Sequence, residues 1–171
     1  MGTVRMRMPV DALELVQAQH EQVDELISQL EDDALPVDRK RAVLHELASQ
    51  LVAHAAMEEL LFYPAVRAKQ TEEILLDPAD EHLALRRALS ELMHTPLGEP
   101  PFEARLAVLK EEFDHHAHEE EEEVLFPELR QLMTEDELVT LGREMRSVFE
   151  RLVGRVPSRE ASPEPDVPTM L

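Results

Sequence analysis

Apolar residues recur along most of this chain at alternating steps of three and four, the spacing that places side chains on one buried face of an α-helix. Residues 10–32 show the pattern first, in Leu13, Val16, His20, Val23, Ile27 and Leu30. The turn LPVD at 35–38 then offers Asp38 as the N-cap of a second helix that runs to about Tyr63. The apolar face of this helix holds Leu44, Leu47, Leu51, His54, Glu58 and Leu61.

Two further long helices follow the same spacing. The segment DPAD at 77–80 starts a third helix, whose buried face carries His82, Leu85, Leu89 and Leu92. The segment TPLGEPP at 95–101 breaks the pattern, and a fourth helix runs from about Phe102 to Pro127. Pro64 lacks a backbone N–H and should kink or end the second helix.

Four long helices with short connections predict an all-α fold, an up-down-up-down four-helix bundle. Residues 134–137, TEDE, resemble a capping box that opens an extra C-terminal helix ending at about Val153. The remaining tail has a proline every few residues and little to bury, so we expect it to be disordered. We therefore divide the chain into an N-terminal extension (1–9), one helical domain (10–153) and a Pro-rich acidic tail (154–171).

The charge balance narrows the classes of partner. Lys and Arg number 17 against 37 Asp and Glu, which gives a net charge of −20 in 171 residues. Such a surface repels nucleic acid and anionic lipid and attracts cations. The sequence contains no apolar run of membrane-spanning length and no secretory signal, so we expect a cytoplasmic protein. A homodimer is compatible with this sequence, which identifies no protein partner.

A repeat connects the two halves of the bundle. His20 and His82 are 62 residues apart, as are His54 and His116, while Glu58 and Glu121 are 63 apart. The segment HAAMEELLFYP is therefore echoed by HAHEEEEEVLFP, and each segment ends in a proline, Pro64 and Pro127, 63 residues apart. Each helical hairpin supplies a histidine from its first helix and a histidine with a glutamate from its second. Each of the four long helices thus carries one histidine on its apolar face.

The spacing within each second helix decides which glutamate can join its histidine. His54 and Glu58 are four residues apart, so they lie about 40° apart on one helix face. Glu120 stands in the same relation to His116, whereas Glu121, the residue that the repeat selects, is five steps away. A π-bulge would absorb that extra residue, and such bulges are common at functional sites. The repeat favours Glu121 and regular helix geometry favours Glu120.

A single histidine on an apolar face is more often a hydrogen-bonded core residue than a ligand. Four in a repeated arrangement are harder to explain in that way, because each would need its own buried partner. Burying two glutamates without a cation would also cost several kcal/mol. The other acidic and imidazole side chains are interpreted as solvent-facing: Glu119, Glu122, Glu123, His45, His94 and His118. His115 lies beside the apolar face and is a poor substitute for His116.

The donor set points to a particular kind of metal. The sequence has no cysteine, so disulfides, iron–sulfur clusters and thiolate ligands are excluded. Four imidazoles and two carboxylates on facing helices suit a pair of iron or manganese ions, bridged by the carboxylates. Zinc usually completes its coordination with about four ligands, and calcium or magnesium would not select histidines.

These residues and their order resemble the hemerythrin family, in its HHE cation-binding branch. The resemblance covers residues 10 to about 150, and rests on His20, His54-x-x-x-Glu58, His82, and His116 with Glu121, followed by LFYP and LFP. It implies a non-heme di-iron centre inside a four-helix bundle, with His20 and His54 on one iron and His82 and His116 on the other. It also implies that Glu58 and Glu121 bridge the irons. The family's fourth helix has a similar uneven spacing, which favours Glu121 over Glu120.

One departure from the family bears on function. The oxygen-carrying members have a further histidine one turn after the third-helix ligand, and this chain has Arg86 there. Four histidines, two bridging carboxylates and a bridging oxo group leave about two of twelve iron positions open, one more than oxygen carriage needs. Glu81, Asp24, Tyr63 or solvent could fill the additional position.

We therefore expect a di-iron protein that binds, senses or handles a small diatomic ligand such as oxygen or nitric oxide, peroxide, or iron itself. The first alternative is an enzyme on the same centre that decomposes peroxide or oxidises iron. The second is a metal-free helical interaction module whose histidines are structural.

Overall fold

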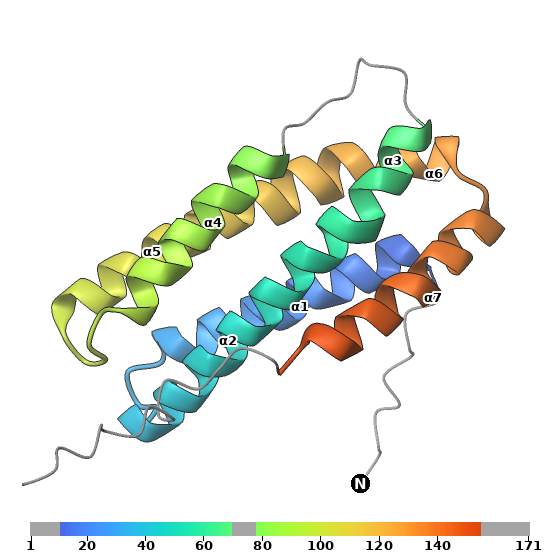
Figure 1. Cartoon of the computed structure of the whole chain (residues 1–171). Helices are drawn as coiled ribbons and strands as arrows, with labels where there is room; N and C mark the ends of the chain where they lie inside the picture. The colour runs from blue at the N-terminus through green and yellow to red at the C-terminus, as the bar shows by residue number, and fades with distance from the viewer. Residues whose placement is uncertain (1–10, 70–77, 155–171) are drawn as a thin grey trace, which may run out of the picture.

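A computed structural model describes residues 11–69 and 78–154. The described part is helical, and its long rods run side by side (Figure 1). The N-terminal extension predicted for 1–9 and the disorder predicted for the tail beyond residue 154 lie outside the described residues. The rods are built from these elements: α1 (Ala12–Glu31); α2 (Val37–Met57), η1 (Glu58–Phe62) and α3 (Tyr63–Lys69) in succession; α4 (Pro78–Met93); α5 (Pro100–Asp114), η2 (His115–Leu125) and α6 (Phe126–Leu132) in succession; and α7 (Glu135–Leu152).

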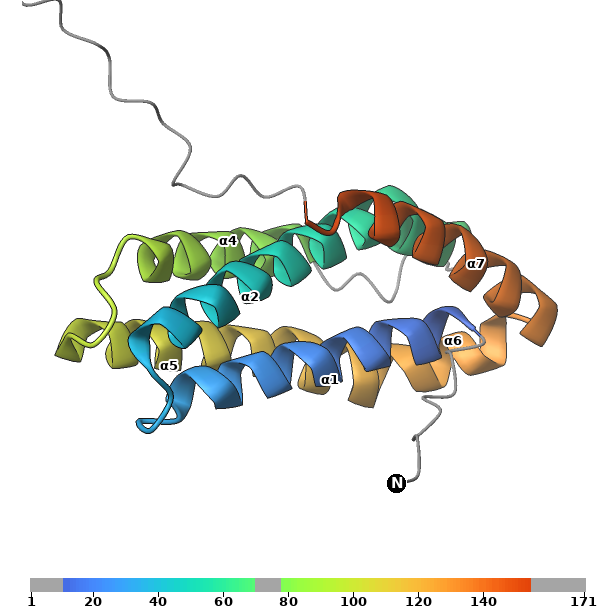
Figure 2. The same ribbon diagram turned by 90° about the horizontal axis from the view of Figure 1, so that it is seen from below.

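The arrangement confirms the predicted bundle with an extra C-terminal helix. α1 packs against α2, and α4 packs against α5, so each hairpin of the repeat forms one antiparallel pair. α7 lies against α1, α2 and η1 at one end of the bundle (Figure 2). Among residues 11–69 and 78–154, no helix combines the length and the apolarity that crossing a membrane requires.

The predicted cap of the second helix is wrong by two residues. α2 begins at Val37 with Pro36 in the cap position, and Asp38 lies in the first turn without capping it. Proline suits the start of a helix because its fixed φ and missing N–H cost nothing there. A carboxylate in the first turn still interacts favourably with the helix dipole.

Pro64 does not end its helix, because the backbone widens just before it. The π-helical η1 precedes Pro64 and its last turn is closed by a bond from the Tyr63 N–H to the Glu58 carbonyl. In η2 the Phe126 N–H donates to the Glu121 carbonyl in the same way, one residue before Pro127. Each rod thus places an i→i+5 turn directly ahead of its proline. The wider turn accommodates the ring, which a regular α-helix would force against the preceding carbonyls.

The core is divided into two apolar clusters. One lies toward the α1–α2 turn and includes Ile27, Leu47, Leu92, Leu109 and Phe113. The second lies toward α7 and is built from residues such as Leu13, Met57, Phe62, Leu129 and Met145. The positions between these clusters along each rod are occupied by buried histidines and glutamates. A polar layer therefore crosses an otherwise apolar bundle.

α7 closes the second cluster through a close backbone approach. Thr134 and Glu137 form the predicted capping box, in which the Thr134 side chain accepts from the Glu137 N–H and the Glu137 side chain accepts from the Thr134 N–H. A Cβ at Gly142 would lie 2.7 Å from the backbone nitrogen of Ala12 and from the carbonyl carbon of Asp11. Glycine therefore allows α7 to touch the start of α1.

Candidate metal centre

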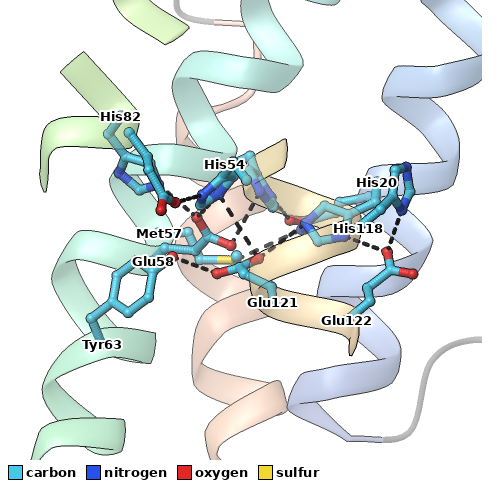
Figure 3. Close-up of polar contacts among 12 residues, drawn as sticks. His20, His54, Met57, Glu58, Tyr63, His82, His118, Glu121 and Glu122 are labelled. Carbon is cyan, nitrogen blue, oxygen red and sulfur yellow. Dashed lines mark hydrogen bonds and ion pairs between the residues drawn. The ribbon is translucent and has the colours of Figure 1, made fainter. Parts of the chain in front are cut away.

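The six side chains selected from the repeat meet in the polar layer. Each of the four long rods contributes a histidine, and the two rods that contain π-helical segments each add a glutamate (Figure 3). Their exposed fractions are at most 2% for every member: His20, His54, Glu58, His82, His116 and Glu121. Burying so many ionisable groups together is costly unless their charges are compensated.

The histidines turn their Nε2 atoms toward the two carboxylates. His54 Nε2 lies 3.1 Å from Glu58 Oε1, and His82 Nε2 lies 3.1 Å from Glu58 Oε2. His20 Nε2 lies 3.2 Å from Glu121 Oε2, while His116 Nε2 lies 3.6 Å from Glu58 Oε2 and 3.9 Å from Glu121 Oε2. Each glutamate therefore spans histidines from both hairpins.

Each Nδ1 atom is occupied by a partner on the outer side of the ring. His20 Nδ1 pairs with Glu122 at 2.6 Å, His54 Nδ1 with Gln19 Oε1 at 2.7 Å, His82 Nδ1 with Glu59 at 2.9 Å and His116 Nδ1 with Glu81 at 2.7 Å. Donation from Nδ1–H to an acceptor fixes the tautomer that leaves the Nε2 lone pair free. Metal-binding histidines are oriented in this way, through the nitrogen that does not bind the ion.

Most of the inner atoms lack hydrogen bonds, whereas His82 Nε2 is hydrogen-bonded to Glu58 Oε2 at 3.1 Å and Glu121 Oε1 accepts from Tyr63. Among the described residues, five inner atoms are buried without a hydrogen-bond partner: His20 Nε2, His54 Nε2, Glu58 Oε1, His116 Nε2 and Glu121 Oε2. Buried polar atoms are rarely left in this state, because it forfeits their hydration without replacement. Unpartnered lone pairs that lie close together in a buried layer fit a cation between them.

The donor atoms fall into two groups that share one residue. One group contains His20, His54, Glu58 and Glu121, and the other contains Glu58, His82 and His116, with the ligand atoms of each group within 4.8 Å of one another. The two oxygens of Glu58 face different groups, as the distances above show. Six buried nitrogen and oxygen donors in two linked groups could hold a pair of metal ions.

The sequence comparison agrees with this geometry. The family profile described as Hemerythrin HHE cation binding domain matches residues 11–129, a span that includes all six side chains. The chain belongs to the hemerythrin HHE cation-binding domain family. A crystal structure of a hemerythrin HHE cation binding domain-containing protein from Mycobacterium kansasii is similar to it, with a TM-score of 0.74 and 28% identity over 85% of this chain and 88% of that one. None of the curated proteins matches the sequence.

The backbone of the HHE domain settles how a five-residue step reaches the same face. His116 and Glu121 both lie within η2, where a turn takes about one more residue than in an α-helix. Glu121 is consequently buried in the polar layer. Glu120 is half-buried outside it, and its carboxylate lies 3.8 Å from His115 Nε2. The structure thus brings Glu121 to the cluster and leaves Glu120 and His115 at its edge.

The electrostatics of the HHE cluster reflect two buried carboxylates among imidazoles. Burial opposes the anion of Glu58, yet His54, His116 and His82 outweigh it and hold the pKa of Glu58 well below its usual range. Burial raises the pKa of Glu121, and the nearby charge of Glu58 raises it further. Two like charges this close are stabilised most directly by a cation between them.

The direction of the pKa shift differs among the four imidazoles according to their partners. Burial alone would favour neutral rings, but Glu121 and Glu122 raise the pKa of His20 to about 9. Burial lowers the pKa of His54 to about 3, and the nearby imidazoles of His20, His116 and His82 lower it against the opposing charge of Glu58. His82 and His116 follow His20, because carboxylates on both sides outweigh burial and raise the pKa of each.

The interpretation of Glu122 as solvent-facing is wrong. Glu122 is half-buried and accepts from His20 Nδ1, and it also lies 3.2 Å from His118 Nδ1. His118 lies at the surface as interpreted, 34% exposed, with Nε2 3.0 Å from Asp24. The sequence pattern missed the contacts of both side chains with α1, because only the packing of the rods creates them.

Arg86 and the candidates for an additional ligand position also have partners. The Arg86 guanidinium is half exposed and donates to the same Glu59 oxygen that pairs with His82, at 2.5 Å. Glu81 is engaged by His116 and Asp24 by His118, while the Tyr63 hydroxyl donates to Glu121 Oε1. Glu81, Asp24 and Arg86 therefore act around the cluster and do not add to its inner donors.

Proposed function

We propose that this HHE domain holds a dinuclear non-heme iron centre that binds, senses or handles oxygen, nitric oxide or peroxide. The observation that carries the proposal is the set of inward nitrogen and oxygen atoms that are buried without hydrogen bonds. A metal-free interaction module would have no reason to leave them unbonded, since each costs about 1–3 kcal/mol.

In this proposal His20 and His54 bind one ion, His82 and His116 bind the other, and Glu58 and Glu121 bridge them. The two donor groups support this division, because each contains one of these histidine pairs and both contain Glu58. Glu121 reaches across as well, at 3.2 Å from His20 and 3.9 Å from His116. We take residues 10–153 as the domain that carries the site. Its cytoplasmic location stays a prediction.

Imidazole and carboxylate donors suit iron, and manganese is the alternative with the same preference for geometry and ligand type. When bound, a pair of such ions supplies one-electron redox chemistry toward oxygen, nitric oxide or peroxide. The protein's own contribution is to hold four rings in one tautomer and to exclude water with an apolar cluster on each side.

The test is the metal content of protein purified without chelators, together with its change on substitution. Wild-type protein should contain about two irons per chain, one for each donor group. His54→Ala should lower both ions together, because the groups share Glu58. His94→Ala, at an exposed position, is the matched control. Zinc or no metal in the wild type would refute the iron assignment, and loss of one ion alone would refute a coupled pair.

A second candidate function is an enzyme on the same centre that decomposes peroxide or oxidises iron. The ion pair of Arg86 with Glu59 favours it, since no inner donor stands where oxygen carriers place their fifth histidine. Arg86→His should slow peroxide turnover by the iron-loaded protein if the new imidazole reaches the open position. No turnover in the wild type would count against an enzymatic role, and equal turnover in both proteins would show that position 86 does not reach the open iron position.

A further inference from the structure

A small pocket opens between α2 and α4 and reaches the metal cluster from the side of the bundle. Its inner end is formed by His54 and His82, which are 2% and 1% exposed. At its outer end lie Val52, 48% exposed, and the half-exposed Arg86. The cavity volume is about 20 Å³, enough for one small molecule, since a single water needs roughly 10–15 Å³.

The walls between these ends are apolar. They are formed by Leu51, Ala55, Leu85 and Leu89, none of which offers a side-chain hydrogen bond. The imidazoles at the inner end do not change this, because their Nδ1 atoms are bonded to Gln19 and Glu59 and their Nε2 atoms face Glu58. A charged or strongly hydrated molecule entering the pocket would lose its hydrogen bonds to water without replacing them. A small uncharged diatomic molecule would lose almost nothing.

Arg86 contributes its stem rather than its charge. Its guanidinium is held outside by Glu59 at 2.5 Å, while its side chain lines the pocket. Long basic side chains commonly cover apolar surface in this way with the charged end in water. The mouth is therefore framed by methyl and methylene groups.

The position of the pocket connects it to both halves of the cluster. His54 belongs to one donor group and His82 to the other, and the two rings lie 3.1 Å from different oxygens of the same carboxylate, that of Glu58. We propose that this pocket is the entry and holding site for a small uncharged diatomic gas, oxygen or nitric oxide, that is destined for the centre. This inference rests on the proposed function and narrows it, because it assigns the apolar route to gases rather than to peroxide or hydrated iron.

The first experiment tests the pocket without any metal. Xenon occupies apolar cavities, so the full-length protein, free of metal, should bind it between α2 and α4 in a xenon-pressurised crystal or by xenon NMR. Val52→Trp places a large ring at the exposed mouth and should abolish this binding. Val108→Trp changes an equally exposed valine on α5 and should leave it intact. Absence of xenon from the wild-type pocket would overturn the proposal even if the protein binds two irons.

The second experiment tests the route in iron-loaded, reduced protein. Stopped-flow absorbance should show Val52→Trp reacting with nitric oxide and with oxygen about tenfold more slowly, the effect of roughly 1.4 kcal/mol added to the entry barrier. Val52→Ala, which widens the mouth, should react faster than wild type, and peroxide should react equally with all three. A loss of stability cannot explain why Val52→Trp slows the reaction with gas while Val52→Ala speeds it. Unchanged gas rates in Val52→Trp, or an equal slowing with peroxide, would overturn the route. Absence of bound iron would refute the proposed function but leave the xenon result standing.

Discussion

Replacing Glu58 with glutamine should abolish binding of both metal ions at once. The side chain is fully buried, with Oε1 3.1 Å from His54 Nε2 and Oε2 3.1 Å from His82 Nε2. Glutamine has nearly the same shape but removes the negative charge, and its NH₂ group has no lone pair to offer an ion. The change therefore removes the bridging negative charge and leaves a single neutral oxygen for the two donor groups that share this residue.

The size of the effect follows from binding linkage. An ion present at 100 times its dissociation constant stabilises the folded state by about 2.7 kcal/mol, so two ions contribute about 5 kcal/mol. In a domain of this length each kcal/mol corresponds to about 2–4 °C in the melting temperature. Loaded wild-type protein should melt about 10–20 °C above its metal-free form. Glu58→Gln should show almost none of this difference.

The assay is thermal unfolding by circular dichroism, with and without added ferrous iron under anaerobic conditions. Glu120→Gln is the matched control, because this half-buried neighbour of the fourth-helix ligands lies outside both donor groups and should retain the full shift. If Glu58→Gln keeps about half of the wild-type shift, the two ions bind independently. That result would refute the reasoning that a shared carboxylate couples them.

Three further outcomes are expected. Metal affinity should fall as pH drops below about 9, because His20, with a pKa of about 9, and two further rings of raised pKa must release protons before they bind an ion. Calorimetry in buffers of different ionisation enthalpy measures this proton release, and a constant affinity between about pH 6 and 9 would contradict the prediction. Glu122→Gln should weaken metal binding about 10–100-fold in a chelator competition, since it removes the carboxylate on His20 Nδ1, whereas Glu123→Gln at the exposed neighbouring position should have no effect. Gly142→Ala should lower the free energy of unfolding by about 1–3 kcal/mol, because its Cβ would meet the α1 backbone at 2.7 Å; an unchanged denaturant midpoint would show that α7 does not pack against α1 so closely.

The all-helical bundle could be predicted from the sequence because its information is local. The three-and-four spacing of apolar residues selects the buried face of each rod, and short connections make neighbouring rods antiparallel. Thr134 and Glu137 form their capping box within one turn, so their pairing could be predicted without knowledge of the tertiary structure. The repeat of His20 with His82 and of Glu58 with Glu121 also survives in the linear sequence, and this placed the candidate site.

The backbone conformation of each rod near the cluster was harder to predict from the sequence. The step from His116 to Glu121 suggested a π-bulge, and the structure has an eleven-residue π segment there. A second π segment, before Pro64, gave no sign in the spacing of His54 and Glu58. His54 lies in α2 and Glu58 is the first residue of η1, and the Glu58 N–H still bonds to the His54 carbonyl, so their spacing is that of an ordinary α-helix.

What the sequence by itself determined is which residue types lie on the inner faces: four histidines and two glutamates in a repeated order within an apolar bundle. Only the tertiary structure decided what holds them. The partners of the outer ring nitrogens come from other rods, as Glu81 does for His116 and Glu122 for His20. The pairing of Arg86 with Glu59, which draws its charge away from the cluster, also joins two rods. Side-chain contacts between residues 27 to 102 positions apart depend on the rotation and depth of packing between helices, which local periodicity does not specify.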